Sequence, residues 1–418
     1  MADRVGFEPT EPLQARRISS AVPSTTRPPV RRRRYWSGWG LASQIPGKCG
    51  ILRAPEEVLA RHRPLPIAVI AALTAAVGLA QIATCSRPAM AADAAPPTGL
   101  RQDVIFPDYG PLARNSEILP RVLTPLTVAG LQREFARTGK TLSETSFDPA
   151  AEKFLVHVPA EKPPQGYGLM VFVPPWQKAQ LPNGWGPVLD QFGVIFVTVA
   201  RSGNEEDIVS RREPLALIAV QNVMAQYPVD PSRVFVGGMS GGSRMALRLA
   251  LAYPDLFRGA LLNSGSDVIG TIYEPLPPAP LFRQFQTATR LLYVTGDEDT
   301  VNLETETRSR RSMQDWCVSD VSSMRMSFTG HEVAPAAVLA RALQSLLDPK
   351  RPDPGRLAAC RAVVEAEVAA ALDQVDALMA AGRHSQARDM LKDIDAKFGG
   401  LAAPRSIALD ALLSPAPP

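Results

Sequence analysis

Residues 233–244 read RVFVGGMSGGSR, and this stretch decides how the chain folds. The apolar residues 234–236 predict a buried strand, and the glycines on both sides of Ser240 predict a tight turn into a helix. Gly238, Ser240 and Gly242 fit the pattern G-x-S-x-G, in which a serine stands on a strained strand-to-helix turn. Any glycine-rich turn can match five residues, but the strand and helix around this one make Ser240 a candidate nucleophile. The phosphate-loop patterns GxxxxGK[ST] and GxGxxG do not fit.

Short apolar runs recur on both sides of this turn, separated by stretches with helical spacing. Continuous apolar runs are typical of strands covered on both faces, as in a mainly parallel sheet. Strand–helix alternation over about 190 residues therefore predicts a doubly wound α/β sheet. The predicted strands are residues 154–158, 168–173, 194–199, 234–236, 260–262, 291–294 and 324–328, and the predicted helices are residues 215–227, 243–253 and 337–347.

A serine nucleophile needs a base, and the base needs an orienting carboxylate. For this type of turn the chain order is serine, acid, histidine. His331 follows the predicted strand 324–328, and the only other histidine after Ser240 is His384, on a helical stretch. We therefore expect His331 to be the base. His157 lies inside a predicted strand, which favours a structural role.

Asp299 and Asp297 are the two candidates for the acid, because both follow the buried run 291–294. Asp267, which follows the strand at 260–262, is a weaker candidate. Ser240, Asp299 and His331 thus fall at three strand ends in the required order.

Residues 227–242 (YPVDPSRVFVGGMSGG) and 252–257 (AYPDLF) resemble the α/β-hydrolase esterases of the polyhydroxybutyrate depolymerase and feruloyl esterase type. The resemblance covers roughly residues 150–347 and is specific for the superfamily, not for a substrate. It implies an α/β-hydrolase fold with a Ser-His-Asp triad. In that family the acid lies three residues after a glycine at the strand exit, which favours Asp299 over Asp297.

The loop after the predicted strand 168–173 departs from this family, which usually has His-Gly there. This chain has Pro174-Pro175-Trp176, and proline has no N–H to donate. We expect the amide of Trp176 or Gln177, with that of Gly241, to form the oxyanion hole, where one lost donor costs about 10²–10³ in rate. Trp176 and Trp185 either line an acyl or aromatic pocket or simply pack.

The first 60 residues have no hydrophobic periodicity and predict disorder. Residues 1–63 hold 12 Lys/Arg against 5 Asp/Glu, whereas the rest of the chain holds 33 against 36. The near-neutral body gives no reason to expect nucleic-acid binding. Residues 5–29 resemble the translation of a transfer-RNA gene caught by a mistaken start codon, so we expect the protein to start near Val58 or Leu59.

Residues 61–91 predict an export signal. A basic start at residues 61–63 precedes an apolar run at 65–83, and Ala89-Met90-Ala91 offers a cleavage site before Ala92. The alternatives are a membrane anchor, since the run is just long enough, and lipidation at Cys85. All three place the body outside the cytoplasm, either periplasmic, secreted or anchored to the membrane.

Cys317 and Cys360 remain after the leader, and an even pair in an oxidising compartment favours a disulfide over two buried thiols. The sequence has no HExxH, CxxC or Cys/His cluster, so we expect no metal or cofactor.

A proline-rich link at residues 348–355 separates the predicted hydrolase domain, residues 92–348, from a helical tail, residues 349–418. Residues 356–398 predict two helices that resemble one tetratricopeptide unit. A single unit cannot form a solenoid, so the pair either packs on the body or docks a protein.

Together these features predict an exported serine esterase that acts on a small-molecule or polymeric ester. A serine peptidase is an alternative that the same triad supports. A non-catalytic binding protein with this fold is another, favoured by Pro174-Pro175.

Overall fold

The computed structural model describes residues 96–350 and 352–414. The predictions for residues 1–60 and for the export signal at 61–91 lie outside the described residues. Within the described ranges, no helix combines the length and the apolar character needed to cross a membrane.

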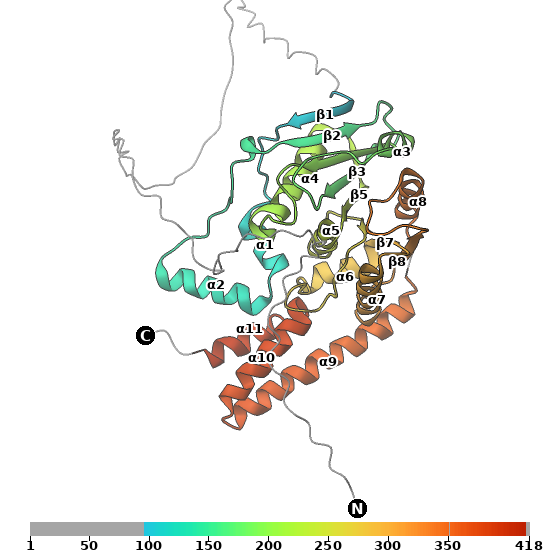
Figure 1. Ribbon diagram of the computed structural model, residues 1–418. Helices are drawn as coiled ribbons and strands as arrows, with labels where there is room; N and C mark the ends of the chain where they lie inside the picture. The colour runs from blue at the N-terminus through green and yellow to red at the C-terminus, as the bar shows by residue number, and fades with distance from the viewer. Residues whose placement is uncertain (1–95, 351, 415–418) are drawn as a thin grey trace, which may run out of the picture. The chain divides into compact units, whose positions relative to one another are not determined.

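Eight strands form one mixed sheet in the order β1-β2-β4-β3-β5-β6-β7-β8 (Figure 1). Strand β2 pairs antiparallel with β1 and β4, and every other pairing is parallel, as predicted for a mainly parallel sheet. The strands are β1 (Gly99–Val104), β2 (Phe154–Val158), β3 (Tyr167–Val173), β4 (Val194–Val199), β5 (Val229–Met239), β6 (Gly259–Asn263), β7 (Arg290–Gly296) and β8 (Val321–Met326).

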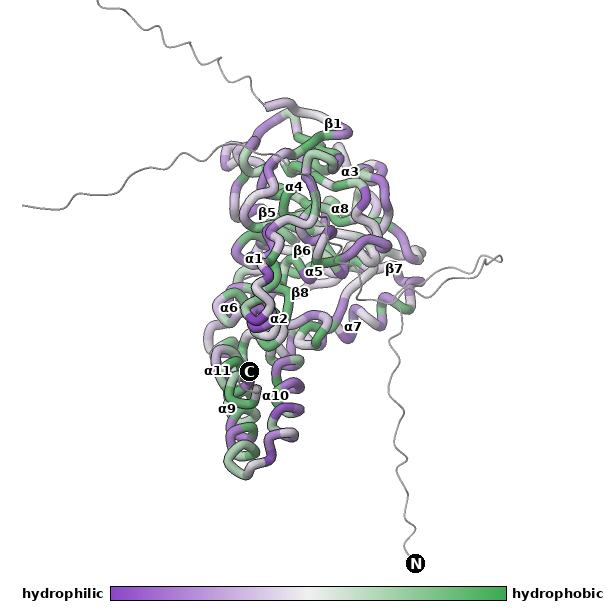
Figure 2. Tube along the Cα trace, turned by 90° about the vertical axis from the view of Figure 1, so that its left-hand side faces the viewer, coloured by the Kyte–Doolittle hydropathy of each residue, from purple (hydrophilic) through white to green (hydrophobic). Residues whose placement is uncertain are grey.

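Both faces of the sheet are covered, and β3 shows how. Its residues Leu169, Val171 and Val173 belong to one hydrophobic cluster, and Met170 and Phe172 belong to another. Alternate side chains of a strand point to opposite faces, so a continuous apolar run fills two cores. Helices α4 and α5 supply the first core, and α3 and α8 supply the second. Figure 2 shows hydrophobic residues concentrated in the strands and in the helices beside them.

The helices that precede the C-terminal region connect the strands. They are α1 (Asn115–Val122), α2 (Pro125–Thr138), α3 (Trp185–Phe192), α4 (Glu213–Gln226), α5 (Gly241–Ala252), α6 (Ala279–Ala288), α7 (Thr300–Asp315) and α8 (Ala336–Leu347). The predicted helices correspond to α4, α5 and α8. Helix α5 starts two residues before the predicted start, directly after Ser240.

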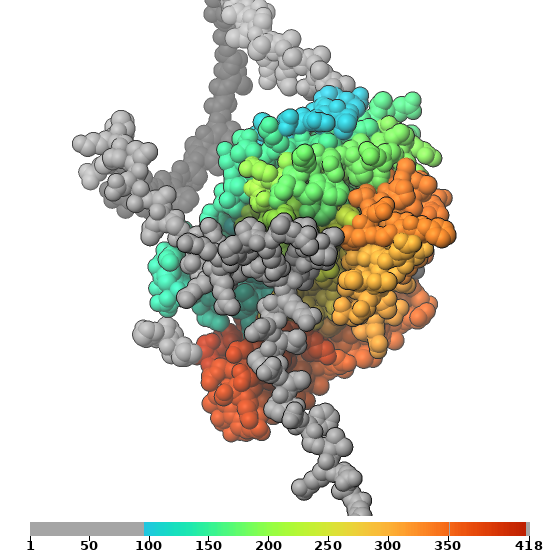
Figure 3. Space-filling model, in the orientation of Figure 1, coloured from blue at the N-terminus to red at the C-terminus, as the bar shows by residue number. Residues whose placement is uncertain are grey.

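The C-terminal region contains α9 (Pro354–Ala380), α10 (His384–Phe398) and α11 (Arg405–Leu413), so it has one helix more than predicted. These helices lie against the body at one end (Figure 3). Asp395 accepts a hydrogen bond from the Leu126 amide at 3.1 Å, and Asp410 pairs with Arg133 at 2.5 Å. The ring of Phe398 packs edge-on against Trp316, with centroids 6.0 Å apart.

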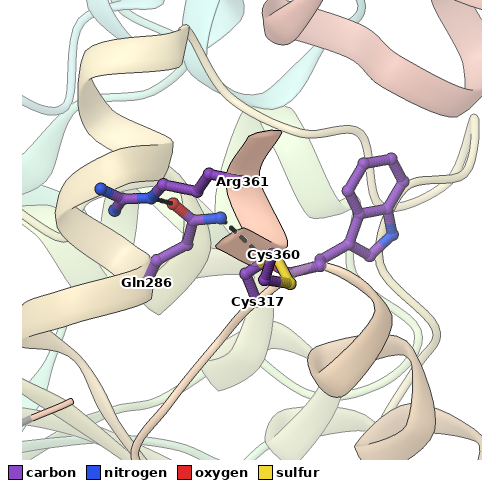
Figure 4. The surroundings of a disulfide bond; sticks show 5 residues. Gln286, Cys317, Cys360 and Arg361 are labelled. Carbon is purple, nitrogen blue, oxygen red and sulfur yellow. Dashed lines mark hydrogen bonds between the residues drawn. A yellow bond between two sulfur atoms is a disulfide. The ribbon is translucent and has the colours of Figure 1, made fainter. Parts of the chain in front are cut away.

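A disulfide joins α9 to the body, as the cysteine count predicted. The Cys317 and Cys360 sulfurs are bonded, across 43 residues of sequence (Figure 4). Beside it, Arg361 Nε donates to Gln286 Oε1 at 2.7 Å, and Gln286 Nε2 donates to the Trp316 carbonyl at 2.8 Å. Covalent and polar contacts therefore fix the first turns of α9 on α6 and the end of α7.

Replacing both Cys317 and Cys360 by serine should lower the free energy of unfolding by roughly 4 kcal/mol, because a loop of this length then regains its freedom in the unfolded chain. Urea titration of the oxidised protein and the double variant measures the difference. Reductant should have a similar effect on the unsubstituted protein and little on the variant. Equal stability of the two proteins would contradict the prediction.

Candidate active site

Ser240 stands at the carboxyl end of β5, immediately before α5. Its backbone has φ 56° and ψ −121°, a region that residues other than glycine rarely occupy. The Ser240 amide donates to the Asn263 carbonyl at 2.8 Å, which ties the turn to β6. Strain held in place by the surrounding structure is typical of functional turns.

Two glycines let the chain turn this tightly. A Cβ atom at Gly238 would lie 2.2 Å from the Gly242 carbonyl oxygen, and one at Gly242 would lie 2.0 Å from the Val173 carbonyl oxygen. Both obstacles are backbone atoms, which cannot move aside as a flexible side chain can. The strand order and this serine turn after β5 together decide the architecture. The chain has the α/β-hydrolase fold.

Asp299 and His331 lie together at the same edge of this α/β-hydrolase sheet. Asp299 follows β7 and precedes α7, and His331 lies in the loop after β8. His331 Nδ1 is 2.7 Å from Asp299 Oδ2. The Asp299 side chain is 7% exposed and that of His331 is 42% exposed, so the carboxylate is buried behind an accessible ring. No hydrogen bond joins the Ser240 hydroxyl to His331 within the part of the chain that the structure describes.

Asn302 supports this pair and is absent from the residues predicted from the sequence. Its Nδ2 lies 2.9 Å from each oxygen of Asp299 and 3.0 Å from His331 Nδ1. An amide donor to both oxygens orients the carboxylate and satisfies it while it is buried. The only sequence signal was its position three residues after Asp299, in the first turn of α7, where Asp299 caps the helix.

The other candidate acids have different partners. Asp297 Oδ1 accepts from the Thr329 amide at 3.2 Å. Asp267 pairs with Arg244 at 3.1 Å, and burial raises the pKa of Asp267. The structure therefore brings Asp299, and neither of its rivals, to His331.

The loop after β3 lies beside the serine turn, since a Cβ atom at Gly242 would lie 3.1 Å from the Pro174 carbonyl carbon, and the carbonyls of both prolines accept hydrogen bonds. The Pro174 carbonyl accepts from Arg212 at 3.1 Å, and the Pro175 carbonyl accepts from the Asn204 amide at 3.1 Å. Arg212 is buried, which lowers its pKa to about 10, and it also donates to the Ser202 carbonyl. A buried arginine therefore joins the loop after β3 to the loop after β4 on this side of the site.

Gly241 and Trp176, whose amides are the expected oxyanion donors, lie against the loop that follows β4 and against β3, respectively. A Cβ atom at Gly241 would lie 2.2 Å from Asn204 Oδ1, so the Asn204 carboxamide lies beside the Gly241 backbone. The Trp176 ring packs near Phe172, with centroids 6.4 Å apart. Its indole Nε1 is buried and has no partner among the described residues.

His157 and Trp185, both considered in the sequence analysis, make contacts that hold neighbouring elements of the fold together. His157 Nε2 lies 2.8 Å from Asp190 Oδ1, a contact that joins β2 to α3. Trp185 is fully buried, packs edge-on against Phe172 and donates its indole N–H to the Ala334 carbonyl at 2.8 Å. Of the two interpretations of Trp185, packing is the one that the structure shows.

The chain is similar to known proteins over short or distantly related stretches. No sequence model of a known protein family matches the chain. A stretch of 46 residues, 11% of this chain and 11% of the relative, is 49% identical to poly(3-hydroxyalkanoate) depolymerase C of Paucimonas lemoignei. The match therefore spans about a tenth of that relative's length.

Similar solved structures include acetyl xylan esterase from Aspergillus awamori, at 15% identity and a TM-score of 0.38, covering 47% of this chain and 94% of that one. Porphyromonas gingivalis dipeptidyl peptidase 4 has 15% identity and a TM-score of 0.36, covering 48% of this chain and 34% of that one.

Proposed function

We propose that this protein is an exported serine hydrolase that cleaves carboxylic esters. The observation that carries the proposal is the meeting of three strand ends at one edge of the sheet. Ser240 stands on a strained turn after β5, and a buried Asp299 bonds the accessible ring of His331 after β7 and β8. These are the parts that nucleophilic catalysis by serine requires.

In the proposed reaction, Ser240 Oγ attacks the ester carbonyl while His331 Nε2 takes the hydroxyl proton. Asp299 orients the ring through Nδ1 and stabilises the imidazolium. The amides of Gly241 and of Trp176 or Gln177 hold the oxyanion. The alcohol leaves with the proton from His331, and an acyl-enzyme remains. Water, deprotonated by His331, then attacks the acyl carbon, and His331 returns that proton to Ser240 Oγ as the bond to the acyl group breaks and the acid leaves.

Several features support export and ester hydrolysis over the alternatives. A disulfide between Cys317 and Cys360 suits an oxidising compartment, either the periplasm or the exterior. The short match to a depolymerase of a polyester favours an ester substrate, small or polymeric, over a peptide. A buried aspartate bonded to an accessible histidine argues against a purely binding role, which has no use for that pair.

The test is covalent labelling of the full chain by a fluorophosphonate, followed by mass spectrometry to find the modified residue. Ser240 should be labelled, and the His331→Ala variant should not react. A folded protein that stays unlabelled would favour a hydrolase-fold binding protein. Cleavage of peptides at rates above those of esters would favour the peptidase.

A further inference from the structure

We propose that Asn263 is a positioning residue that aligns His331 with Ser240. The inference rests on the proposed function, because it names what holds the base of that reaction in place. Asn263 does not touch the reacting atoms in this proposal. It acts through the loop that carries His331.

The place of Asn263 in the sheet brings it beside two of the three strand ends of the site, those of β5 and β7. It is the last residue of β6, which lies between β5 and β7. In register it stands beside Met239, the residue before Ser240, and beside Val294 of β7. Its carbonyl accepts the Ser240 amide at 2.8 Å. The backbone of Asn263 thus fixes the nucleophile turn.

The side chain of Asn263 reaches the segment that follows His331. Its Oδ1 accepts from the Ala334 amide at 2.7 Å. Its Nδ2 lies 3.1 Å from the Glu332 carbonyl, 3.2 Å from the Val294 carbonyl and 3.1 Å from Ser264 Oγ. Both ends of the carboxamide therefore bind the backbone that follows His331: Nδ2 donates to the Glu332 carbonyl, and Oδ1 accepts from the Ala334 amide.

A polar side chain at this position needs an explanation, because Asn263 is fully buried. Burying a carboxamide is costly unless it is hydrogen-bonded, and the neighbours on its face of the sheet, Leu261 and Val294, are apolar. Its main gain is to pair a buried amide and a carbonyl of the His331 loop, which would otherwise be left without partners.

The loop needs such support because it has no regular secondary structure between β8 and α8. Asp299 fixes only the Nδ1 side of the His331 ring. The direction of Nε2 toward Ser240 depends on where the loop backbone lies. Trp185 is a second support, since its indole N–H donates to the carbonyl of Ala334, the residue whose amide binds Asn263. A displacement of about 1 Å in such a site can cost about 10²-fold in rate.

The test compares Asn263→Ala with Asn222→Ala. Asn222 is also a buried asparagine, and its Nδ2 donates to two backbone carbonyls, of Ile218 and Asp108, in α4 and its surroundings. With a short-chain p-nitrophenyl ester, Asn263→Ala should lower kcat about 10²-fold and change KM less than about threefold. The rate of fluorophosphonate inactivation should fall by the same factor. Asn222→Ala should lower the melting temperature and leave kcat unchanged.

A double-mutant cycle separates positioning from a general loss of structure. Removing His331 should cost far less in the Asn263→Ala background than in the unsubstituted chain, because Asn263 acts through that ring. Independent, multiplicative losses would overturn the proposal. So would an Asn263→Ala variant that is less stable but has unchanged kcat.

If Asn263→Ala does not fold, Trp185→Phe carries the test, since it deletes one N–H donor to the same Ala334 and keeps an aromatic ring. It should lower kcat about tenfold, less than Asn263→Ala, because one of several supports is removed. An unchanged kcat would overturn the proposal. A wild-type chain that never reacts with the fluorophosphonate would instead refute the proposed function, so the two failures are distinguishable.

Discussion

Replacing Ser240 by alanine is expected to lower kcat for ester hydrolysis by about 10⁶, down to the level that binding and the oxyanion donors alone sustain. The loss is this large because the acyl-enzyme route needs an attacking oxygen, and no neighbouring group replaces it. The measurement is hydrolysis of a short-chain p-nitrophenyl ester by variant and unsubstituted protein. Serine and alanine both have a Cβ atom, so the substitution leaves the backbone strain at this turn unchanged. The fold should therefore survive.

Ser232→Ala is the matched control, because Ser232 lies near the opposite end of the same strand β5 and is exposed. It should retain full activity. Substantial activity in Ser240→Ala would mean that another nucleophile performs the reaction, and the proposed mechanism would then be wrong.

Replacing Asp299 by asparagine is expected to lower kcat by about 10⁴. The carboxylate accepts a hydrogen bond from the Nδ1–H of His331, which keeps the proton on Nδ1 and leaves Nε2 free to act as a base. An asparagine amide that donates to Nδ1 would stabilise the opposite tautomer, with the proton on the nitrogen that must take one from Ser240. The nearby Asn302 amide, 3.0 Å from Nδ1, would favour that wrong tautomer further.

Asp297→Asn is the control for this prediction, because the two residues share a loop and differ in their partners. Asp297 accepts a hydrogen bond from the backbone amide of Thr329, whereas Asp299 is the carboxylate that binds His331. We expect less than about a tenfold change in kcat for Asp297→Asn, measured beside Asp299→Asn. A larger loss in Asp297→Asn than in Asp299→Asn would reverse the assignment of the acid.

The central strands of the sheet could be predicted from the sequence because their apolar runs are continuous. Strand β1 was missed because residues 99–104 contain polar residues and lie at the edge of the sheet. The last strand was predicted too late, at residues 324–328. It ends at Met326, and Phe328, with φ 55° and 92% exposure, lies in the turn that follows. An aromatic residue there was mistaken for a core residue.

Similar reasoning explains what could be predicted of the candidate site. Serine, aspartate and histidine are chemically distinctive when they follow predicted strands, so Ser240, Asp299 and His331 stood out as candidates. Asn302 and Asn263 were missed because asparagine is ordinary in a sequence. Asn263 gains its importance from backbone groups of a loop about 70 residues later in the chain, and only the fold shows this contact.

The C-terminal helices limit how this protein could be recombined. Their interface with the body includes the Phe398 ring on Trp316, and Gly400, whose Cβ position would lie 2.2 Å from the Pro277 carbonyl oxygen. An exchange of residues 354–413 for those of an unrelated protein would need matching changes in at least three separate parts of the body, including α2. Residues 354–413 are therefore not a module that can be exchanged without redesigning the surface of the body.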